Sequence, residues 1–314
     1  DYIAYQMSGG INTTPSGLSE GILWDFPENK TASFVLDYFG FDASFIPEIV
    51  PNFGIQSEVS TEAAELLGIP AGTPIAYRAG DQPNNALSLS VLNPGEVAAT
   101  AGTSGVVYGI VDSPEYDSLS RVNSFVHVNH SKEKNRYGVL LCVNGTGILN
   151  RWMKENYIST EQTGLSYDKM NNLAESVPAG AEGLSILPFG NGAERTLSNQ
   201  DPGASFHNLN FNIHRVPHLL RAGQEGIVFA LNYGLEIMKG MNIEAGTVKA
   251  GYANMFLSPL FRSVFATVTD SPVELYSTDG AQGAARGAGI GAEIFADEQE
   301  AFHGLEKKEM VEPD

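Results

Sequence analysis

Cysteine is almost absent from this sequence. Cys142 is the single cysteine among 314 residues, so no disulfide can form within the chain. It lies in the apolar run 138–143, which predicts a buried structural thiol and not a nucleophile. No apolar stretch is long enough to span a bilayer and no signal peptide opens the chain, so nothing in the sequence marks the protein for export. These features fit a protein of the reducing cytoplasm.

Basic residues are also scarce. Lys and Arg number 18 against 37 Asp and Glu, which gives a formal net charge of −19. Such a field repels a nucleic-acid backbone and an anionic membrane surface, so neither is expected as a partner. The same field opposes the approach of nucleotide phosphates. If a nucleotide binds, local backbone N–H groups and a metal ion must therefore hold its phosphates.

The apolar content is that of a globular protein. Hydrophobic residues make up 42% of the chain and charged residues 18%, which excludes a disordered chain. At this length two packed units are the first expectation, and one large α/β domain is the alternative. The chain opens without Met, in what reads as the middle of an element, so we expect a fragment of a longer protein.

The pattern of elements changes near residue 75. Residues 1–75 are rich in turn signals and carry two short helical patterns, 31–39 and 60–68, the second with Ser60 placed to cap its start. Beyond them strands and helices alternate, as in an α/β fold. The predicted strands are 75–78, 96–100, 105–111, 137–143 and one ending at 251. The predicted helices are 84–91, one through 148–153, 218–239, and one over 255–265 that requires Pro259 in its first turn.

A stretch of very small residues lies near the end of the chain, at 280–292. If it is helical, it must pack backbone to backbone against a neighbour, because it offers few side chains to fill a gap. The glycines at 287–291 do not have the spacing of a dinucleotide-binding fingerprint and follow no strand.

Asp81 follows a predicted strand and a glycine, in the segment 79–82. A carboxylate at the carboxyl end of a strand points into the crevice where open α/β sheets bind ligands, and there it can accept a proton from an attacking hydroxyl. The alternative is an ordinary turn or helix-capping Asp. By itself the motif favours the alternative.

Glycine-rich loops supply the candidate phosphate sites. Gly102, Thr103 and Ser104 join two predicted strands and can form a nest of N–H groups without any lysine, although a plain hairpin turn has the same composition. Segment 144–147 aims a helix N-terminus at whatever lies above the sheet. No Walker A motif occurs. The polar cluster 191–196 either lines a cleft or forms a solvated loop, and the six histidines lack metal-ligand spacing, so we expect them on the surface.

Taken in order, the motifs resemble those of the FGGY family of carbohydrate kinases, and within it the xylulose kinases most closely. The matching segments are Asp1–Gly10, Ala79–Gln82, Pro94–Gly105, Pro188–Thr196, Ala250–Asn254 and Asp279–Ala285. The sequence departs from the family pattern at Leu197, where proline is usual, and at Ala250 and Tyr252, where glycine is common. The resemblance covers essentially the whole chain.

The resemblance implies an α/β fold of actin-like ATPase, ribonuclease-H-like type, with two domains around a cleft that holds ATP and a sugar. Residues 1–75 would be the end of the first, sugar-binding domain and residues 76–314 the second, ATP-binding domain. The family's amino-terminal phosphate loop would precede residue 1, so the fragment alone is expected to be inactive. Family members also commonly form homodimers.

The resemblance also implies a reaction: transfer of the γ-phosphoryl group of ATP, with Mg²⁺, to a ketopentose, D-xylulose first. Asp81 would be the catalytic base and a metal contact, and Gln82 would lie beside it at the sugar. The nucleotide residues would be Gly102, Thr103 and Ser104 at the phosphates, Gly145 in the cleft, and Gly251 and Asn254 at the adenosine. The alternatives are another sugar or polyol kinase, acting on glycerol, gluconate, ribulose or a deoxyketose, and a non-catalytic nucleotide-binding module.

Overall fold

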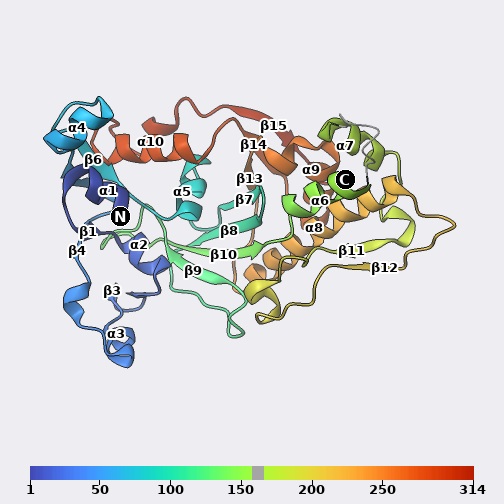
Figure 1. The fold of residues 1–314 in the computed structure, drawn as a ribbon, viewed down its shortest axis with the longest axis horizontal. Coiled ribbons are helices and arrows are strands. Elements are labelled where there is room, and N and C mark those ends of the chain that lie inside the picture. Colours follow the sequence, from blue (N-terminus) through green and yellow to red (C-terminus); the bar gives the residue numbers. More distant parts are fainter. Residues whose placement is uncertain (158–165) are drawn as a thin grey trace.

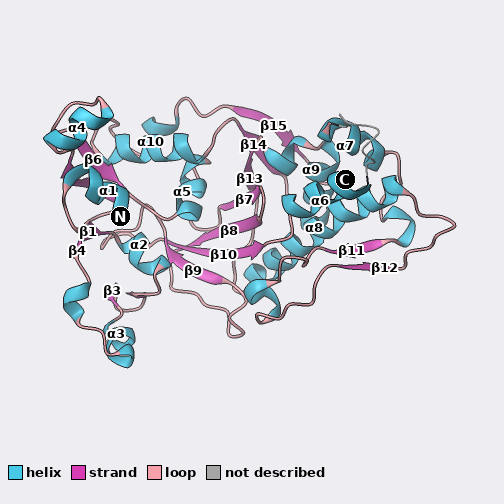
Figure 2. Ribbon diagram, in the orientation of Figure 1, coloured by secondary structure: helices cyan, strands magenta, loops and turns pink. Residues whose placement is uncertain are grey.

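A seven-stranded mixed sheet forms the centre of the protein, in the order β15-β14-β13-β7-β8-β10-β9 (Figures 1 and 2). The computed structural model describes residues 1–157 and 166–314. The strands of this sheet are β7 (Val97–Ala101), β8 (Gly105–Val111), β9 (Asn123–Val126), β10 (Tyr137–Val143), β13 (Val248–Gly251), β14 (Val273–Tyr276) and β15 (Lys307–Val311). β13 runs parallel to both β7 and β14, whereas β7, β8, β10 and β9 pair antiparallel. The predicted hairpin 96–111 and strand 137–143 are confirmed.

Helices cover both faces of this sheet, and β7 shows why. Its Val97, Ala99 and Ala101 side chains join the larger core, which also contains residues of α8 and α9, while Ala98 joins a second core with Ala86 of α5. A strand buried on both faces is apolar at every position and does not alternate. The helices on the first face are α6 (Gly147–Tyr157), α7 (Tyr167–Glu175), α8 (Val216–Gly240) and α9 (Pro259–Thr269); α5 (Asp81–Ser88) lies on the second.

α10 (Gly280–Gly291) is the predicted small-residue helix, and it packs against α5 and β6 (Pro74–Tyr77). A Cβ atom at Gly283 would lie 2.9 Å from the Asn84 carbonyl oxygen, and one at Gly287 would lie 2.7 Å from the Tyr77 ring. Real Cβ atoms need more room, so only glycine permits this approach. The prediction of backbone-to-backbone packing is confirmed.

The first 77 residues form short helices and three two-stranded sheets at one end of the molecule (Figure 1). These elements are α1 (Tyr2–Ser8), β1 (Asn12–Thr13), α2 (Pro15–Glu20), β2 (Trp24–Asp25), β3 (Lys30–Thr31), α3 (Ser33–Phe39), β4 (Glu48–Ile49), β5 (Phe53–Glu58), α4 (Thr61–Leu67) and β6. β5 pairs with β6, so the predicted domain boundary at 75 falls inside a strand. At the opposite end, β11 (Ser185–Leu187) pairs with β12 (Ser205–His207).

Local signals set several helix ends as predicted. The Ser60 hydroxyl accepts a hydrogen bond from the Ala63 N–H at 3.1 Å, and α4 ends at Gly68 in the left-handed region. Pro259 is the first residue of α9, where its missing N–H is not needed. The helix expected at 84–91 begins and ends three residues earlier, at Asp81 and Ser88.

The expectation of surface histidines is wrong for His127 and His214, which are 0% and 7% exposed. His127 lies between the Tyr108 hydroxyl and the Val91 carbonyl oxygen, each 3.1 Å from a ring nitrogen, so its polar atoms are satisfied inside the core. Cys142, expected to be buried, is half-buried on β10. In the described part of the chain, no helix is long and apolar enough to cross a bilayer.

Candidate functional site

Three loops meet at one end of the central sheet: the tip of the β7–β8 hairpin, the turn between β10 and α6, and the segment after β13. The Gly147 N–H donates to the Gly102 carbonyl at 2.9 Å, and the Ile148 N–H donates to the Thr103 carbonyl at 3.3 Å. The first turn of α6 is therefore bonded directly to the hairpin tip. Ser104 Oγ also donates to Asn144 Oδ1 at 3.4 Å, which ties the other side of the tip to the same turn.

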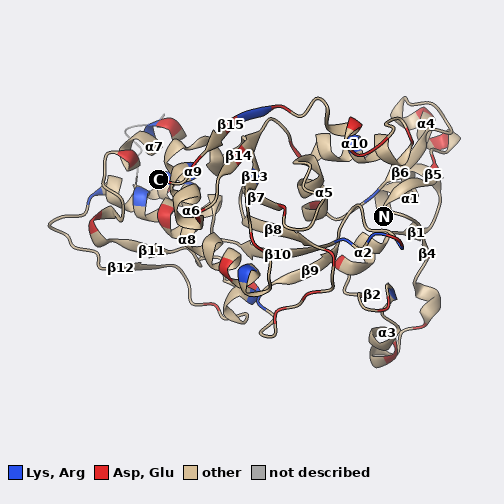
Figure 3. Ribbon diagram, turned by 180° about the vertical axis from the view of Figure 1, so that it is seen from behind, with Lys and Arg blue, Asp and Glu red and all other residues tan. Residues whose placement is uncertain are grey.

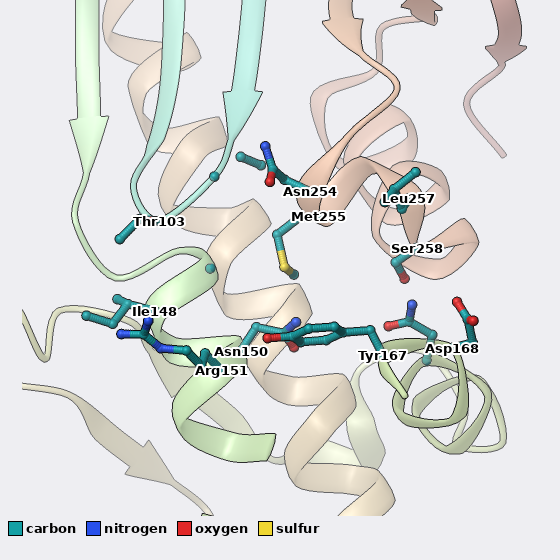
Figure 4. Close-up of a pocket in the computed structure, with 14 residues that line it drawn as sticks. Thr103, Ile148, Asn150, Arg151, Tyr167, Asp168, Asn254, Met255, Leu257 and Ser258 are labelled. Carbon is teal, nitrogen blue, oxygen red and sulfur yellow. The ribbon is translucent and has the colours of Figure 1, made fainter. Parts of the chain in front are cut away.

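One cavity of about 380 Å³ opens beside this junction, on the side of α6 and α7. Its walls combine apolar and amide side chains, as in a pocket for a flat organic ligand. Figure 4 shows Thr103, Ile148, Asn150, Asn254, Met255 and Ser258 around it, and Gly102, Gly147 and Asn171 complete this part of the lining. We call it the α7 cavity.

A second cavity, of about 350 Å³, lies against α5, and we call it the α5 cavity. It is lined by five of the residues singled out in the sequence, which come from three separate segments: Gln82, Gly102, Ser104, Gly251 and Asn254. Gly102 and Asn254 line both cavities, so the hairpin tip and the end of β13 form the wall between them. Thr103 lines only the α7 cavity.

Asp81 is the first residue of α5; it does not line the α5 cavity itself but directly precedes Gln82, which does. Its side chain is exposed, and its Oδ2 accepts a hydrogen bond from Gln82 Nε2 at 3.3 Å. The preceding Gly80 N–H donates to Ser16 Oγ at 3.2 Å, which fixes this turn to α2. Asp81 is thus held beside the cavity from two sides.

Glu20, the last residue of α2, is a second carboxylate at this turn. Its carboxylate occupies the space that a side chain at position 80 would need, so only glycine fits there. Burial and then the negative charge of Asp81 raise the pKa of Glu20 above its ordinary value. Sequence reasoning missed Glu20, because nothing in a local pattern brings a residue at position 20 to a motif at 79–82.

Gly145 lies on the far side of α6 from both cavities. It lines a third cavity, of about 330 Å³, together with Pro188 and Trp152, and its Cα faces the Pro188 carbonyl. In the turn between β10 and α6, the glycine that lines the α7 cavity is Gly147. The polar cluster 191–196 bonds to this turn, because Asn144 Nδ2 donates to Glu194 Oε1 at 2.7 Å.

The chain as a whole carries 37 acidic against 18 basic residues, and Figure 3 shows acidic and basic residues at both ends of the molecule. Burial, and then the charge of Glu194, raise the pKa of the Cys142 thiol to about 11, so it is neutral and a poor nucleophile. Arg151 is the basic residue that lines the α7 cavity. Within 1–157 and 166–314, no group of three or more His, Cys, Asp or Glu side chains is placed to hold a metal ion.

Comparison with known proteins decides the family. A model of the C-terminal domain of the FGGY carbohydrate kinases matches residues 97–292, which include most of the central sheet. The chain belongs to the FGGY family of carbohydrate kinases. The resemblance proposed from the motifs is therefore confirmed.

The relatives of this FGGY chain differ in their named substrates. A gluconokinase of Bacillus licheniformis is 29% identical over 243 residues, which is 74% of this chain and 46% of the relative. A xylulose kinase of Staphylococcus xylosus is 26% identical over 300 residues, 94% of this chain and 59% of the relative. The chain thus spans about half the length of these relatives.

Solved structures confirm the fold class. The xylulose kinase of Rhodospirillum rubrum superposes on the whole chain with a TM-score of 0.87 at 24% identity, and the match covers 62% of that structure. The ligand-bound xylulose kinase of Lactobacillus acidophilus gives a TM-score of 0.89 at 21% identity, again over 62% of its length. The protein has the α/β, actin-like ATPase fold of this family, of which it spans a part.

Proposed function

We propose that this FGGY chain serves in the transfer of the γ-phosphoryl group of ATP to a hydroxyl of a small ketose, with D-xylulose as the first candidate. One observation carries the proposal. Gln82, Gly102, Ser104, Gly251 and Asn254 line a single cavity, and Asp81 directly precedes Gln82. Residues that the family resemblance assigns to sugar and nucleotide are thus neighbours in space.

In this proposal Asp81 accepts the proton of the attacking hydroxyl. Its exposed position at the start of α5 allows a sugar hydroxyl to approach, and Gln82 fixes the carboxylate through the bond described above. Mg²⁺ bound to the phosphates supplies charge neutralisation, and Asp81 is the carboxylate placed to hold it. A magnesium ion needs only one or two protein carboxylates when it also binds phosphate oxygens.

The hairpin tip is the proposed phosphate site. The acidic protein lacks a lysine there, so phosphate oxygens would be held by the N–H groups of residues 102–104. The first N–H groups of α6 instead hold the tip in place, because Gly147 and Ile148 donate to the Gly102 and Thr103 carbonyls. Adenosine would then occupy the α7 cavity, where Asn254 is part of the lining. Gly251 lines the α5 cavity, on the other side of the wall that separates the two cavities. Gly145 would support the α6 turn from outside the cavity.

Gluconate is the second candidate acceptor, because gluconokinases of two Bacillus species are 29% and 30% identical to the chain. An ADP-release assay over xylulose, gluconate, glycerol, ribulose and a deoxyketose separates these substrates. In the complete protein, absence of ADP release with every acceptor, together with retained ATP binding, would favour a non-catalytic nucleotide-binding module. A homodimer and a cytoplasmic location stay predictions.

Replacement of the proposed base tests the mechanism. Loss of a general base costs about two to four decades in rate, so in the complete protein Asp81→Asn should lower kcat by that amount and leave the Kd of ATP nearly unchanged. Asp270→Asn is the matched control, since Asp270 lines neither cavity and asparagine tolerates its left-handed backbone at the end of α9. Turnover of Asp81→Asn close to that of the control would remove Asp81 from the mechanism.

A further inference from the structure

The α7 cavity contains a buried amide that the family motifs do not include. Asn171, on α7, lines the cavity and is only 7% exposed. Its Oδ1 accepts a hydrogen bond from Gln224 Nε2, on α8, at 3.1 Å. Gln224 itself is 1% exposed and is not part of the cavity wall. The amide of Asn171 is therefore held from behind, by the protein core.

A chain of hydrogen bonds fixes which way this amide faces. Ser258 caps α9, and its Oγ accepts from the Phe261 N–H at 3.2 Å, so the hydroxyl proton is free to point elsewhere. That proton is donated to Gln224 Oε1 at 3.0 Å. In this arrangement Oε1 of Gln224 faces Ser258 and its Nε2 faces Asn171, so the Oδ1 of Asn171 is turned toward α8.

Nδ2 of Asn171 is thus left as a donor beside the cavity. Among the described residues it has no hydrogen-bond acceptor, although the side chain is nine-tenths buried. The side chain lines the cavity, so this N–H group opens toward the cavity and is available to a ligand there. A ligand atom with a free lone pair in the α7 cavity would satisfy it.

We propose that Asn171 is a specificity-determining residue of the nucleotide site, and that its Nδ2 donates a hydrogen bond to a ring nitrogen of adenine. The inference rests on the proposed function, in which the α7 cavity holds the adenosine. Adenine carries three unprotonated ring nitrogens that accept hydrogen bonds, N1, N3 and N7. The apolar side chains of Ile148, Met255 and Leu257, and the ring of Tyr167, offer surface for the flat faces of a purine (Figure 4).

Deaza nucleotides test the proposal, because each replaces one ring nitrogen by a C–H group. The analogues are 1-deaza-ADP, 3-deaza-ADP and 7-deaza-ADP. In calorimetric titrations we expect the protein to bind one of them about tenfold more weakly than ADP, because the complex with that analogue lacks one hydrogen bond. Asn171→Ala should bind ADP more weakly and should bind that analogue and ADP equally. Equal affinity for ADP and all three analogues in the unmodified protein would overturn the proposal, as would discrimination that survives in Asn171→Ala.

Gln224→Glu tests the relay without touching the cavity. An ionised carboxylate can only accept, so at a pH high enough to ionise this buried carboxyl Asn171 must turn its Nδ2 toward position 224 and its oxygen toward the base. The variant should therefore lose the same discrimination, and an unchanged preference for ADP would refute the relay. Asn172→Asp is the control for added charge, because Asn172 is the exposed neighbour on α7 and is not part of the cavity lining.

Two further measurements keep the outcomes distinct. Thermal unfolding shows whether each variant folds, and Asn171→Ser replaces Asn171→Ala if the latter does not. Failure of the unmodified protein to bind ADP at all would count against the proposed function. Binding of ADP without discrimination among the analogues would count against the role of Asn171 alone.

Discussion

Gly147→Ala should disrupt the nucleotide site through one added methyl group. Gly147 starts α6 and touches the hairpin tip through its bond to the Gly102 carbonyl. A Cβ atom there would overlap the Gly102 carbonyl oxygen, and would lie 3.0 Å from the Gly102 carbonyl carbon and 3.5 Å from the Thr103 nitrogen. All three neighbours are backbone atoms, so no flexible side chain can move aside.

The size of the effect follows from these distances. Carbon atoms in contact prefer about 3.5–4.0 Å, so the hairpin tip must move away by at least about half an ångström. Overpacking of this kind costs about 1–3 kcal/mol of stability. A shift on the order of 1 Å in groups that position a reactant can cost about 100-fold in rate. We therefore expect kcat/KM for ATP to fall by about one to two decades.

Steady-state kinetics with varied ATP and a thermal melt measure both effects. Gly246→Ala is the control, because a Cβ atom at Gly246 has no atom within 4 Å and its backbone needs no positive φ. The control should match the unmodified protein in both assays. If Gly147→Ala kept the KM for ATP and the melting temperature of that control, the hairpin tip would not be the phosphate site that we propose.

Two further predictions concern pH. Glu20 has a raised pKa in the folded protein, so its ionisation opposes folding above its ordinary pKa of 4.5. Because the residue as a whole is solvent-exposed and its carboxyl group is only partly desolvated, Glu20→Gln should stabilise the protein by only a few tenths of a kcal/mol (roughly 0.3) at neutral pH. Urea titrations should show this gain vanish below pH 4.5, and a gain that persists in acid would contradict it. Burial lowers the pKa of His127 from 6.5 to about 3, so the unfolded chain binds a proton that the folded chain does not, and stability falls as the pH drops below 6.5. The loss should reach about 2 kcal/mol at pH 5, and His127→Gln should flatten the urea-unfolding profile between these values; an unchanged profile would show that another group titrates.

Prediction from the sequence succeeded where the signal was short in range. The strand 137–143 has the predicted bounds, because a run of apolar residues ends at a glycine turn. The cap at Ser60 and the start of α9 at Pro259 depend on three or four consecutive residues. The helix expected at 84–91 begins three residues earlier, at Asp81, and Pro83 lies in its first turn, where a helix tolerates proline.

The candidate site was found in part. Glycines that form a hairpin tip or a tight turn are visible in a sequence because few other residues can replace them. Which of two glycines in one loop faces a cavity is not visible, and Gly145 and Gly147 lie on different sides of α6. The burial of His127 could not be predicted either. A polar residue is expected on the surface unless its hydrogen-bond partners are known, and the partners of His127 come from other elements.

By itself, the sequence indicated part of the strand and helix order, the glycine loops and the family resemblance, all of which depend on residues close together in the chain or on motifs in a fixed order. It did not indicate β9, β14, β15 or α7. Only the tertiary structure decided that Glu20 lies beside the turn of Asp81 and that Gly147 is hydrogen-bonded to the hairpin tip. It also decided that Gln224 donates a hydrogen bond to Asn171, which is 53 residues away in the sequence. The physical reason is that packing of the whole core determines which distant segments are in contact. A local sequence pattern does not indicate which side chains that packing brings together.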